Sequence, residues 1–219
     1  MHTTVVFTGG PSPDPGDLAR AAGRLEGISP DRVIAADGGL HLARALGFSA
    51  DLVVGDLDSV DPGRLGDAVD SGTVVERHPA DKDETDLELA LDAALDAGTE
   101  RVIVVGVDDG RLDHLLGGVA VLAAPRFAPL RPEAWLGGAL VVPVRGERDV
   151  IGAAGALVSL LALHGPADGI STDGLKWRLD DERLEPGSSR GVSNRLTQDR
   201  AVVRVASGCV VVIVPGEEA

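Results

Sequence analysis

An alternation of two kinds of segment over residues 1–125 constrains the fold more than any other feature of the sequence. Short runs rich in β-branched residues each lead through a Gly- and Asp-rich turn into an Ala- and Leu-rich stretch with helical spacing. The runs are residues 4–8, 32–36, 52–54, 73–77 and 101–105. Several are almost wholly apolar, which is typical of strands covered on both faces. The alternation predicts an α/β fold with a doubly wound, mostly parallel sheet and right-handed crossovers.

The pattern changes after about residue 125. Pro and Gly residues interrupt the chain between positions 125 and 138, and no strong helical period follows. Apolar runs separated by Gly-, Pro- and Ser-rich turns lie at residues 139–144, 156–163, 201–205 and 210–214. This second half therefore predicts a small, mainly antiparallel β-domain. We expect two domains, at residues 1–125 and 133–219.

Composition excludes several classes of function. The chain has 35 acidic and 20 basic residues, for a formal net charge of -15, and no run of Lys or Arg. Such a charge repels a phosphate backbone, so we do not expect nucleic-acid binding. Cys209 is the single cysteine, which excludes an intrachain disulfide and a Cys-based zinc site. Without a leader-like N-terminus or an apolar run of about 18 residues, the sequence predicts a soluble, cytoplasmic protein.

Acidic residues follow four successive predicted strands. In an open α/β sheet, ligands bind beyond the carboxyl ends of the strands. The acidic segments are residues 37–39, 55–59, 81–86 and 108–114. We therefore expect folding to bring their side chains to a shared rim of the sheet.

Asp56 and Asp58 suggest a metal site. They are two residues apart, so an extended backbone points both side chains the same way. Two carboxylates held close together repel each other, and a bound cation relieves that repulsion. Oxygen ligands favour Mg²⁺, which usually binds one or two carboxylates together with substrate phosphates. The alternative is a simple turn in which Asp is chosen for local hydrogen bonding.

Residues 81–86 are almost all charged and precede the clearest helical stretch, residues 83–97. Lys82 is a candidate phosphate contact. The alternative for the acidic residues is helix capping, because Asp is a preferred N-cap and Asp81 with Glu84 resembles a capping box.

Arg111 and Asp113 are again two residues apart. The guanidinium group of Arg suits phosphate oxygens through paired hydrogen bonds, and the alternative is a surface ion pair between the two side chains. We expect His114 to have a structural, hydrogen-bonding role. The chain lacks the Gly-x-x-x-x-Gly-Lys-Ser/Thr element, so it is not a P-loop enzyme.

Six short motifs, in this order and spacing, resemble the thiamine pyrophosphokinase family. They are ADGG at residues 36–39, DLVVGDLDS at 51–59, DKDETDLELAL at 81–91, GRLDH at 110–114, GLKWRL at 174–179 and GVSN at 191–194. Each motif alone is weak, but together they extend over both predicted domains. Lys82 stands where some members have Gln, which indicates a bacterial-type variant.

The resemblance implies an ATP-binding catalytic α/β domain at residues 1–125 and a thiamine-binding antiparallel β-sandwich at residues 133–219. It also implies a homodimer with thiamine bound near the subunit interface. In such enzymes, Mg²⁺ is held by the acidic residues that match Asp56, Asp58 and Asp86. The ATP and reaction site is lined by those matching Asp37, Lys82, Thr85, Arg111 and Asp113. Thiamine is seated with the help of those matching Ser193 and Asn194. We expect Trp177, which lies in the fifth motif, to pack in the core.

The implied reaction is an in-line attack by the thiamine hydroxyl on the β-phosphorus of ATP, with AMP leaving. Positioning and charge neutralisation would supply most of the catalysis, with Arg111 and Lys82 offsetting negative charge. Asp113 and Asp58 are both candidates for accepting the hydroxyl proton. A pterin diphosphokinase would use the same phosphate machinery, and a non-catalytic thiamine or nucleotide sensor would share the scaffold. The motifs of the second domain favour thiamine, and the clustered carboxylates favour an enzyme.

Overall fold

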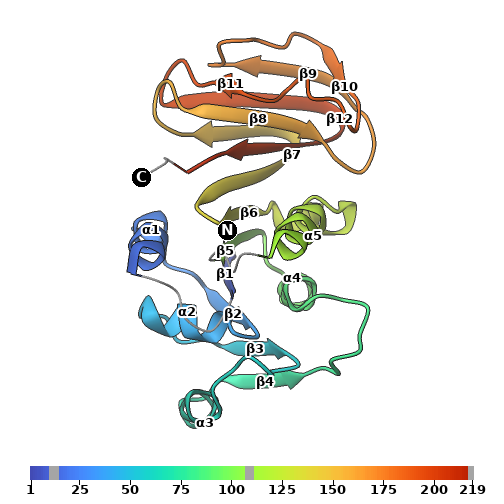
Figure 1. The fold of residues 1–219 in the computed structure, drawn as a ribbon. Helices are drawn as coiled ribbons and strands as arrows, with labels where there is room; N and C mark the ends of the chain where they lie inside the picture. Colours follow the sequence, from blue (N-terminus) through green and yellow to red (C-terminus); the bar gives the residue numbers. More distant parts are fainter. Residues whose placement is uncertain (10–14, 107–110, 217–219) are drawn as a thin grey trace. The chain divides into compact units, whose positions relative to one another are not determined.

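The computed structural model describes residues 1–9, 15–106 and 111–216 (Figure 1). The chain divides into two compact units, one of residues 1–118 with 129–138 and the other of residues 119–128 with 139–219. Helix α5 (Leu112–Leu122) and the 3₁₀ helix η1 (Pro125–Leu130) contribute residues to both units. Over the described ranges, no helix has the length and apolar character needed to cross a membrane.

The first unit is a parallel sheet with helices on its faces. Its strands are β1 (Thr3–Thr8), β2 (Arg32–Ala36), β3 (Leu52–Gly55), β4 (Val74–Arg77), β5 (Arg101–Gly106) and β6 (Glu133–Leu136). Its other helices are α1 (Pro15–Leu25), α2 (Gly39–Ala45), α3 (Pro62–Asp70) and α4 (Asp86–Asp96). The strand order is β6-β5-β1-β2-β3-β4, and every neighbouring pair is parallel. Helices α1 and α2 lie on one face and α4 on the other, which confirms the predicted doubly wound α/β fold (Figure 1).

Burial explains why the apolar runs became strands. In β1, the side chains from Val5 to Phe7 are fully buried, as are those of the middle residues of β5. Strand β4 lies at the edge of the sheet and is largely exposed, which fits its mixed sequence Val-Val-Glu-Arg. The sequence pattern did not single out β6, a run of only four residues that pairs with β5.

The second unit is an antiparallel β-sandwich, as the resemblance implied. Its strands are β7 (Ala139–Ile151), β8 (Leu157–Ala162), β9 (Ala167–Asp173), β10 (Glu182–Leu184), β11 (Asn194–Arg195) and β12 (Arg200–Val214). The long strand β12 pairs with β7 along most of its length, with β9 in its first half and with β8 in its second half. The register shifts between Val205 and Val210, where Gly208 has a φ of 83°. Such a bulge bends a strand, which allows β12 to serve both layers.

Candidate active site

A pocket of about 620 Å³ lies in the first unit, at the carboxyl ends of the parallel strands. Its wall includes the ends of β1, β2 and β5, the loop after β3 and the start of α4. Eight of the residues singled out from the sequence line it: Asp37, Asp56, Asp58, Lys82, Thr85, Asp86, Arg111 and Asp113. Asp108, Asp109 and Gly110 lie outside the described residues, and Ser193 and Asn194 belong to the second unit.

Three carboxylates form the tightest acidic group in the described part of the chain. One oxygen from each of Asp37, Asp56 and Asp58 lies within 4.8 Å of the others. Asp86 is outside this group but adjoins it, because a Cβ added at Gly55 would lie 3.0 Å from Asp86 Oδ1 and 3.2 Å from the Cβ of Asp37. Of the predicted metal set, Asp56 and Asp58 thus group with Asp37, which sequence reasoning had assigned only to the ATP site, and Asp86 lies next to this group.

The backbone around this group is held in unusual conformations. Asp37 has a φ of 45° and Leu57 a φ of 65°, whereas few residues other than Gly adopt positive values. Leu57 turns the chain so that Asp56 and Asp58 both reach the pocket, and its side chain is buried in the core. Non-Gly residues in such conformations tend to cluster at functional sites. Asp is one of the residue types enriched at positive φ, whereas Leu is not, so the sequence could not reveal the turn at position 57.

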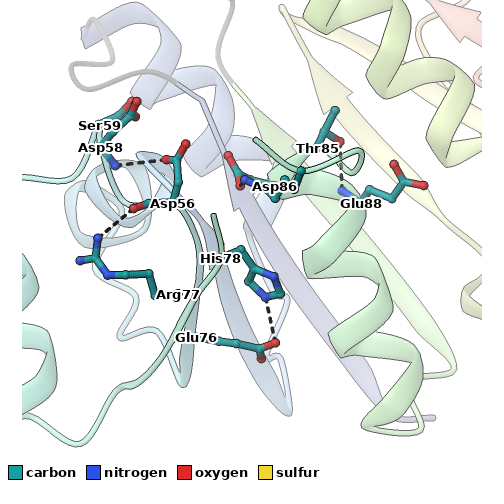
Figure 2. Close-up of polar contacts among 10 residues, drawn as sticks. Asp56, Asp58, Ser59, Glu76, Arg77, His78, Thr85, Asp86 and Glu88 are labelled. Atoms are coloured by element: carbon teal, nitrogen blue, oxygen red, sulfur yellow. Dashed lines mark hydrogen bonds and ion pairs between the residues drawn. The ribbon is translucent and has the colours of Figure 1, made fainter. Parts of the chain in front are cut away.

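Local hydrogen bonds order the loop after β3, residues 56–61, which we call the acidic loop. Asp58 N donates to Asp56 Oδ1 at 3.2 Å, and Ser59 Oγ donates to Asp58 Oδ1 at 3.0 Å. From the neighbouring strand β4, Arg77 Nη1 donates to the Asp56 carbonyl oxygen at 3.0 Å (Figure 2). The alternative interpretation, a simple turn, predicted local hydrogen bonds of this kind. These bonds nevertheless leave carboxylate oxygens directed at the pocket.

The electrostatics of the pocket favour a cation. Burial raises the pKa of Asp37 above its ordinary value, a hydrogen bond with Ser59 opposes the rise, and the charges of Asp86 and Asp56 add to it. Asp37 Oδ1 and Asp86 Oδ1 are buried and have no hydrogen-bond partner among the described residues. Lys82 Nζ lies 3.0 Å from Asp86 Oδ1, so that oxygen has an ion-pair partner without hydrogen-bond geometry. Within the described part of the chain, these buried oxygens have no hydrogen-bond partners and lie within or beside the group of three converging carboxylates. Together they form a set of oxygen ligands that fits a hard divalent ion.

Helix α4 begins at Asp86, three residues later than the pattern predicted. Thr85 is its N-cap, with Oγ1 accepting from Glu88 N at 3.3 Å (Figure 2). The capping box proposed for Asp81 and Glu84 is therefore wrong. Because Thr85 satisfies the free helix terminus, the Asp86 carboxylate is not needed as a cap and faces the pocket.

Arg111 and Asp113 form the ion pair that was considered as an alternative for them. Arg111 donates from Nε to Oδ1 at 3.2 Å and from Nη2 to Oδ2 at 2.5 Å. The hydrogen bonds from Arg111 lower the pKa of Asp113 to about 2. A carboxylate with so low a pKa is a poor proton acceptor near neutral pH.

In the second unit, Asn194 is buried and its side chain is fully engaged with backbone groups. Its Oδ1 accepts from Trp177 N at 3.1 Å and from Arg195 N at 2.8 Å, and its Nδ2 donates to Trp177 O at 2.7 Å. Trp177 is 54% exposed, with Lys176 Nζ 4.7 Å from the ring centroid, so the prediction that it packs in the core is wrong. Adjacent to Asn194, Ser193 has a φ of 63°.

Family models identify both parts of the chain. Residues 29–131 match the thiamin pyrophosphokinase catalytic domain, and residues 146–210 match the thiamin pyrophosphokinase vitamin B1 binding domain. The chain belongs to the thiamin pyrophosphokinase family. The resemblance drawn from the six motifs is thereby confirmed, and the chain is an enzyme of the pyrophosphokinase type.

Individual thiamin pyrophosphokinases agree with this assignment. The thiamine pyrophosphokinase of Bacillus subtilis is 26% identical over 162 residues, which cover 73% of this chain and 75% of that protein. The crystal structure of thiamine pyrophosphokinase from Bacillus subtilis superposes with a TM-score of 0.80 at 22% identity and covers 99% of both chains. That of thiamin pyrophosphokinase from Geobacillus thermodenitrificans has a TM-score of 0.74 at 26% identity, covering 100% of this chain and 99% of the other.

Each of the two matched regions contains most of one of the features described above. The acidic pocket falls largely within the catalytic-domain match, and Trp177 with Asn194 falls within the vitamin B1 binding match. Two contributions escaped sequence reasoning, the place of Asp37 in the carboxylate group and the exposure of Trp177. For Asp37, the available signal was its position directly after a buried strand, as for Asp56.

Proposed function

We propose that this chain transfers a diphosphate group from ATP to the hydroxyl of thiamine, giving thiamine diphosphate and AMP. The observation that carries the proposal is the pocket of the first unit, where six carboxylates line one space at the strand ends together with Lys82 and Arg111. That space lies in the region matched to the catalytic domain of the family. Strand ends are where ligands of open α/β sheets bind.

The proposed metal ligands are Asp56 and Asp58, as predicted, together with Asp37, with Asp86 next to them. Oxygens of the first three lie within 4.8 Å of one another, and Asp86 Oδ1 is buried with Lys82 Nζ 3.0 Å away as its ion-pair partner. Bound Mg²⁺ would supply charge neutralisation for the phosphate oxygens of ATP. Without a bound cation, these carboxylates would repel the triphosphate of ATP. The acidic group is therefore compatible with nucleotide binding only when it holds a cation.

The other pocket residues position the reactants in this proposal. Lys82 and Arg111 contact phosphate oxygens and offset their charge, and Thr85 adds a hydroxyl at the start of α4. The thiamine hydroxyl oxygen bonds to the β-phosphorus while the bond from that phosphorus to the α-β bridging oxygen breaks, and AMP leaves with that oxygen. The hydroxyl proton passes to Asp58 or Asp113, and the ion pair with Arg111, while it is intact, lowers the pKa of Asp113 to about 2 and so weakens Asp113 as an acceptor.

Measurement of AMP tests the reaction directly. With ATP and Mg²⁺, we expect AMP to form at a rate that depends on thiamine, and thiamine diphosphate to appear in equal amount. A pterin diphosphokinase would instead form AMP with a hydroxymethyl pterin and not with thiamine. Binding of thiamine or ATP with no AMP under any condition would support the sensor and reject the proposal.

Thiamine is proposed to contact the second unit around Trp177, Ser193 and Asn194. An exposed indole face attracts a cationic, aromatic ligand such as thiamine. Asn194 acts in this proposal by holding the Trp177 backbone with hydrogen bonds, rather than by reaching the ligand. The homodimer and the cytoplasmic location remain predictions.

Removing the indole is expected to weaken thiamine binding selectively. For Trp177→Ala we expect the KM for thiamine to rise about tenfold, because a desolvated cation–π contact contributes about 1–2 kcal/mol. The KM for ATP should change little. Trp177→Phe keeps an aromatic face and should recover most of the loss in steady-state assays. Equal thiamine KM values for Trp177→Ala and wild type would contradict this role.

A further inference from the structure

His41 is a buried histidine whose surroundings are not explained by core packing. It lies on α2, four residues after Asp37, and only 4% of its surface is exposed. Buried polar side chains normally have partners that account for their position. The hydrogen-bond partners of this ring are Ser59, Asp61 and Arg64, which belong to the end of the acidic loop and the start of α3.

Both ring nitrogens are engaged. Nδ1 lies 3.0 Å from Arg64 Nη1, and Nε2 lies 3.3 Å from both the Ser59 carbonyl oxygen and the Asp61 amide nitrogen. A guanidinium group can only donate, so Nδ1 must accept, and we assign the ring proton to Nε2. In that tautomer, Nε2–H donates to Ser59 O. The other tautomer would let Nε2 accept from Asp61 N at 3.3 Å, but it would set an Nδ1–H group against the closer Arg64 donor at 3.0 Å, so each tautomer gives up one of these two contacts.

We propose that His41 is a positioning residue that fixes the acidic loop against α2, so that Asp56 and Asp58 are held close to Asp37. Helix α2 begins directly after the Asp37 turn, so His41 joins the two acidic segments through one rigid element. On the other side of the loop, Arg77 holds the Asp56 carbonyl oxygen. The loop is thereby anchored from both neighbouring strands, β2 through α2 and β4 through Arg77.

Such anchoring matters because the carboxylates repel one another. Unless the backbone holds the carboxylates together, their repulsion moves the acidic loop away from Asp37. Bringing the carboxylates back together then costs free energy, which weakens cation binding. Residues that orient metal ligands without touching the metal typically change metal affinity or activity by about 10–100-fold when mutated. The effect on Mg²⁺ rests on the proposed function, whereas the effect on the order of the loop does not.

The test compares three substitutions at position 41. His41→Leu keeps volume and removes both hydrogen bonds. His41→Gln places an amide nitrogen near the position of Nε2, and His41→Asn reaches only the position of Nδ1. Thr99→Val is the matched control, because it removes a buried hydrogen bond of 2.7 Å to Thr4 at the opposite end of the sheet.

Two readouts are needed. The first is backbone amide hydrogen exchange of residues 56–64 in the metal-free protein, which we expect to be at least tenfold faster in His41→Leu and His41→Asn, and near wild type in His41→Gln and Thr99→Val. The second is the Mg²⁺ concentration for half-maximal turnover, which we expect to rise about 10–100-fold in the same two variants. The KM for thiamine should not change.

The outcomes separate this proposal from the proposed function. Wild-type exchange in the acidic loop of His41→Leu and His41→Asn would overturn the positioning role, whatever the enzyme catalyses. If His41→Leu does not fold, the contrast between the Gln and Asn variants decides the matter, and equal exchange in those two would also overturn it. An inactive wild-type protein with loop exchange as expected would reject the proposed function and leave the positioning role supported.

Discussion

Asp37→Asn is expected to reduce kcat by about 10²–10³, the size of effect that follows loss of one preorganised electrostatic group. The side chain keeps its shape but loses the charge that completes the carboxylate group with Asp56 and Asp58. The backbone tolerates the change, since Asp37 has a φ of 45° and Asn is among the few residues that adopt such values readily. The loss should therefore report on charge rather than on misfolding.

The same substitution is expected to leave the metal-free protein at least as stable as the wild type. Burial, together with the charges of Asp86 and Asp56, raises the pKa of Asp37 above its ordinary 3.8. The folded state therefore binds this proton more tightly than the unfolded state, and the stability that this provides is lost as the pH rises through the raised pKa. Asn carries no charge at any pH, so the advantage of Asp37→Asn should be present at neutral pH and vanish below about 3.8.

Thermal unfolding at pH 7 and at low pH, with turnover measured at saturating Mg²⁺, checks both halves of this prediction. Asp67→Asn is a suitable control. Its carboxylate is 67% exposed and pairs with Arg44 on the surface, so its removal should affect neither property much. Full turnover in Asp37→Asn would exclude Asp37 from the proposed metal site. A strongly lowered Tm would show that the Asp37 charge stabilises the fold, against the electrostatic argument.

Gly39→Ala is expected to have the largest effect on stability. Helix α2 begins so close to β1 that a Cβ at position 39 would lie 2.1 Å from the carbonyl oxygen of Phe7 and 2.9 Å from Thr8 N. These are backbone atoms of a strand that is hydrogen-bonded to neighbours on both sides, so they cannot move aside as a flexible side chain can. We expect a loss of about 3 kcal/mol in the free energy of unfolding, at the upper end for overpacked sites.

Urea denaturation of Gly39→Ala alongside Gly66→Ala provides the comparison. Gly66 lies within α3, and a Cβ there would meet no atom within 4 Å. An added methyl group at that site restricts only the unfolded chain and favours the helix, so we expect a gain of about 0.5–1 kcal/mol. Opposite signs for one chemical change would trace the effect to the contact with β1. Similar stabilities for the two variants would contradict the close approach.

The sequence predicted the architecture well because hydrophobic patterning is local. The runs at residues 4–8, 32–36, 52–54 and 101–105 are buried strands covered by helices, and the run at 73–77 is the largely exposed edge strand β4, in which Val75 packs against the core. The start of α4 was misplaced, since Thr85 and three nearby acidic residues all have capping potential and only the folded backbone selects among them. Strand β6 was missed because its sequence, Glu-Ala-Trp-Leu, contains no β-branched residue, unlike the other strands of the first unit.

The candidate site, too, was predicted from the sequence only in part. Residue types and spacing were sufficient to indicate which carboxylates belong to the pocket, because acidic residues after parallel strands converge wherever the sheet forms. Which of these carboxylates lie closest to one another depends on the folded structure and not on the sequence pattern. Asp37 joins Asp56 and Asp58 through a turn of positive φ, while Asp86 pairs with Lys82.

What the sequence by itself determined is the fold class, the family and the set of side chains at the strand ends, since each follows from the order of residues along the chain. Tertiary structure alone decided the approach of Asp37 to Asp56 and Asp58, the exposure of Trp177 and the attachment of the acidic loop to His41. Those features depend on distances between residues of different segments. Hydrogen-bond partners at such distances are selected by packing, which a linear pattern does not encode.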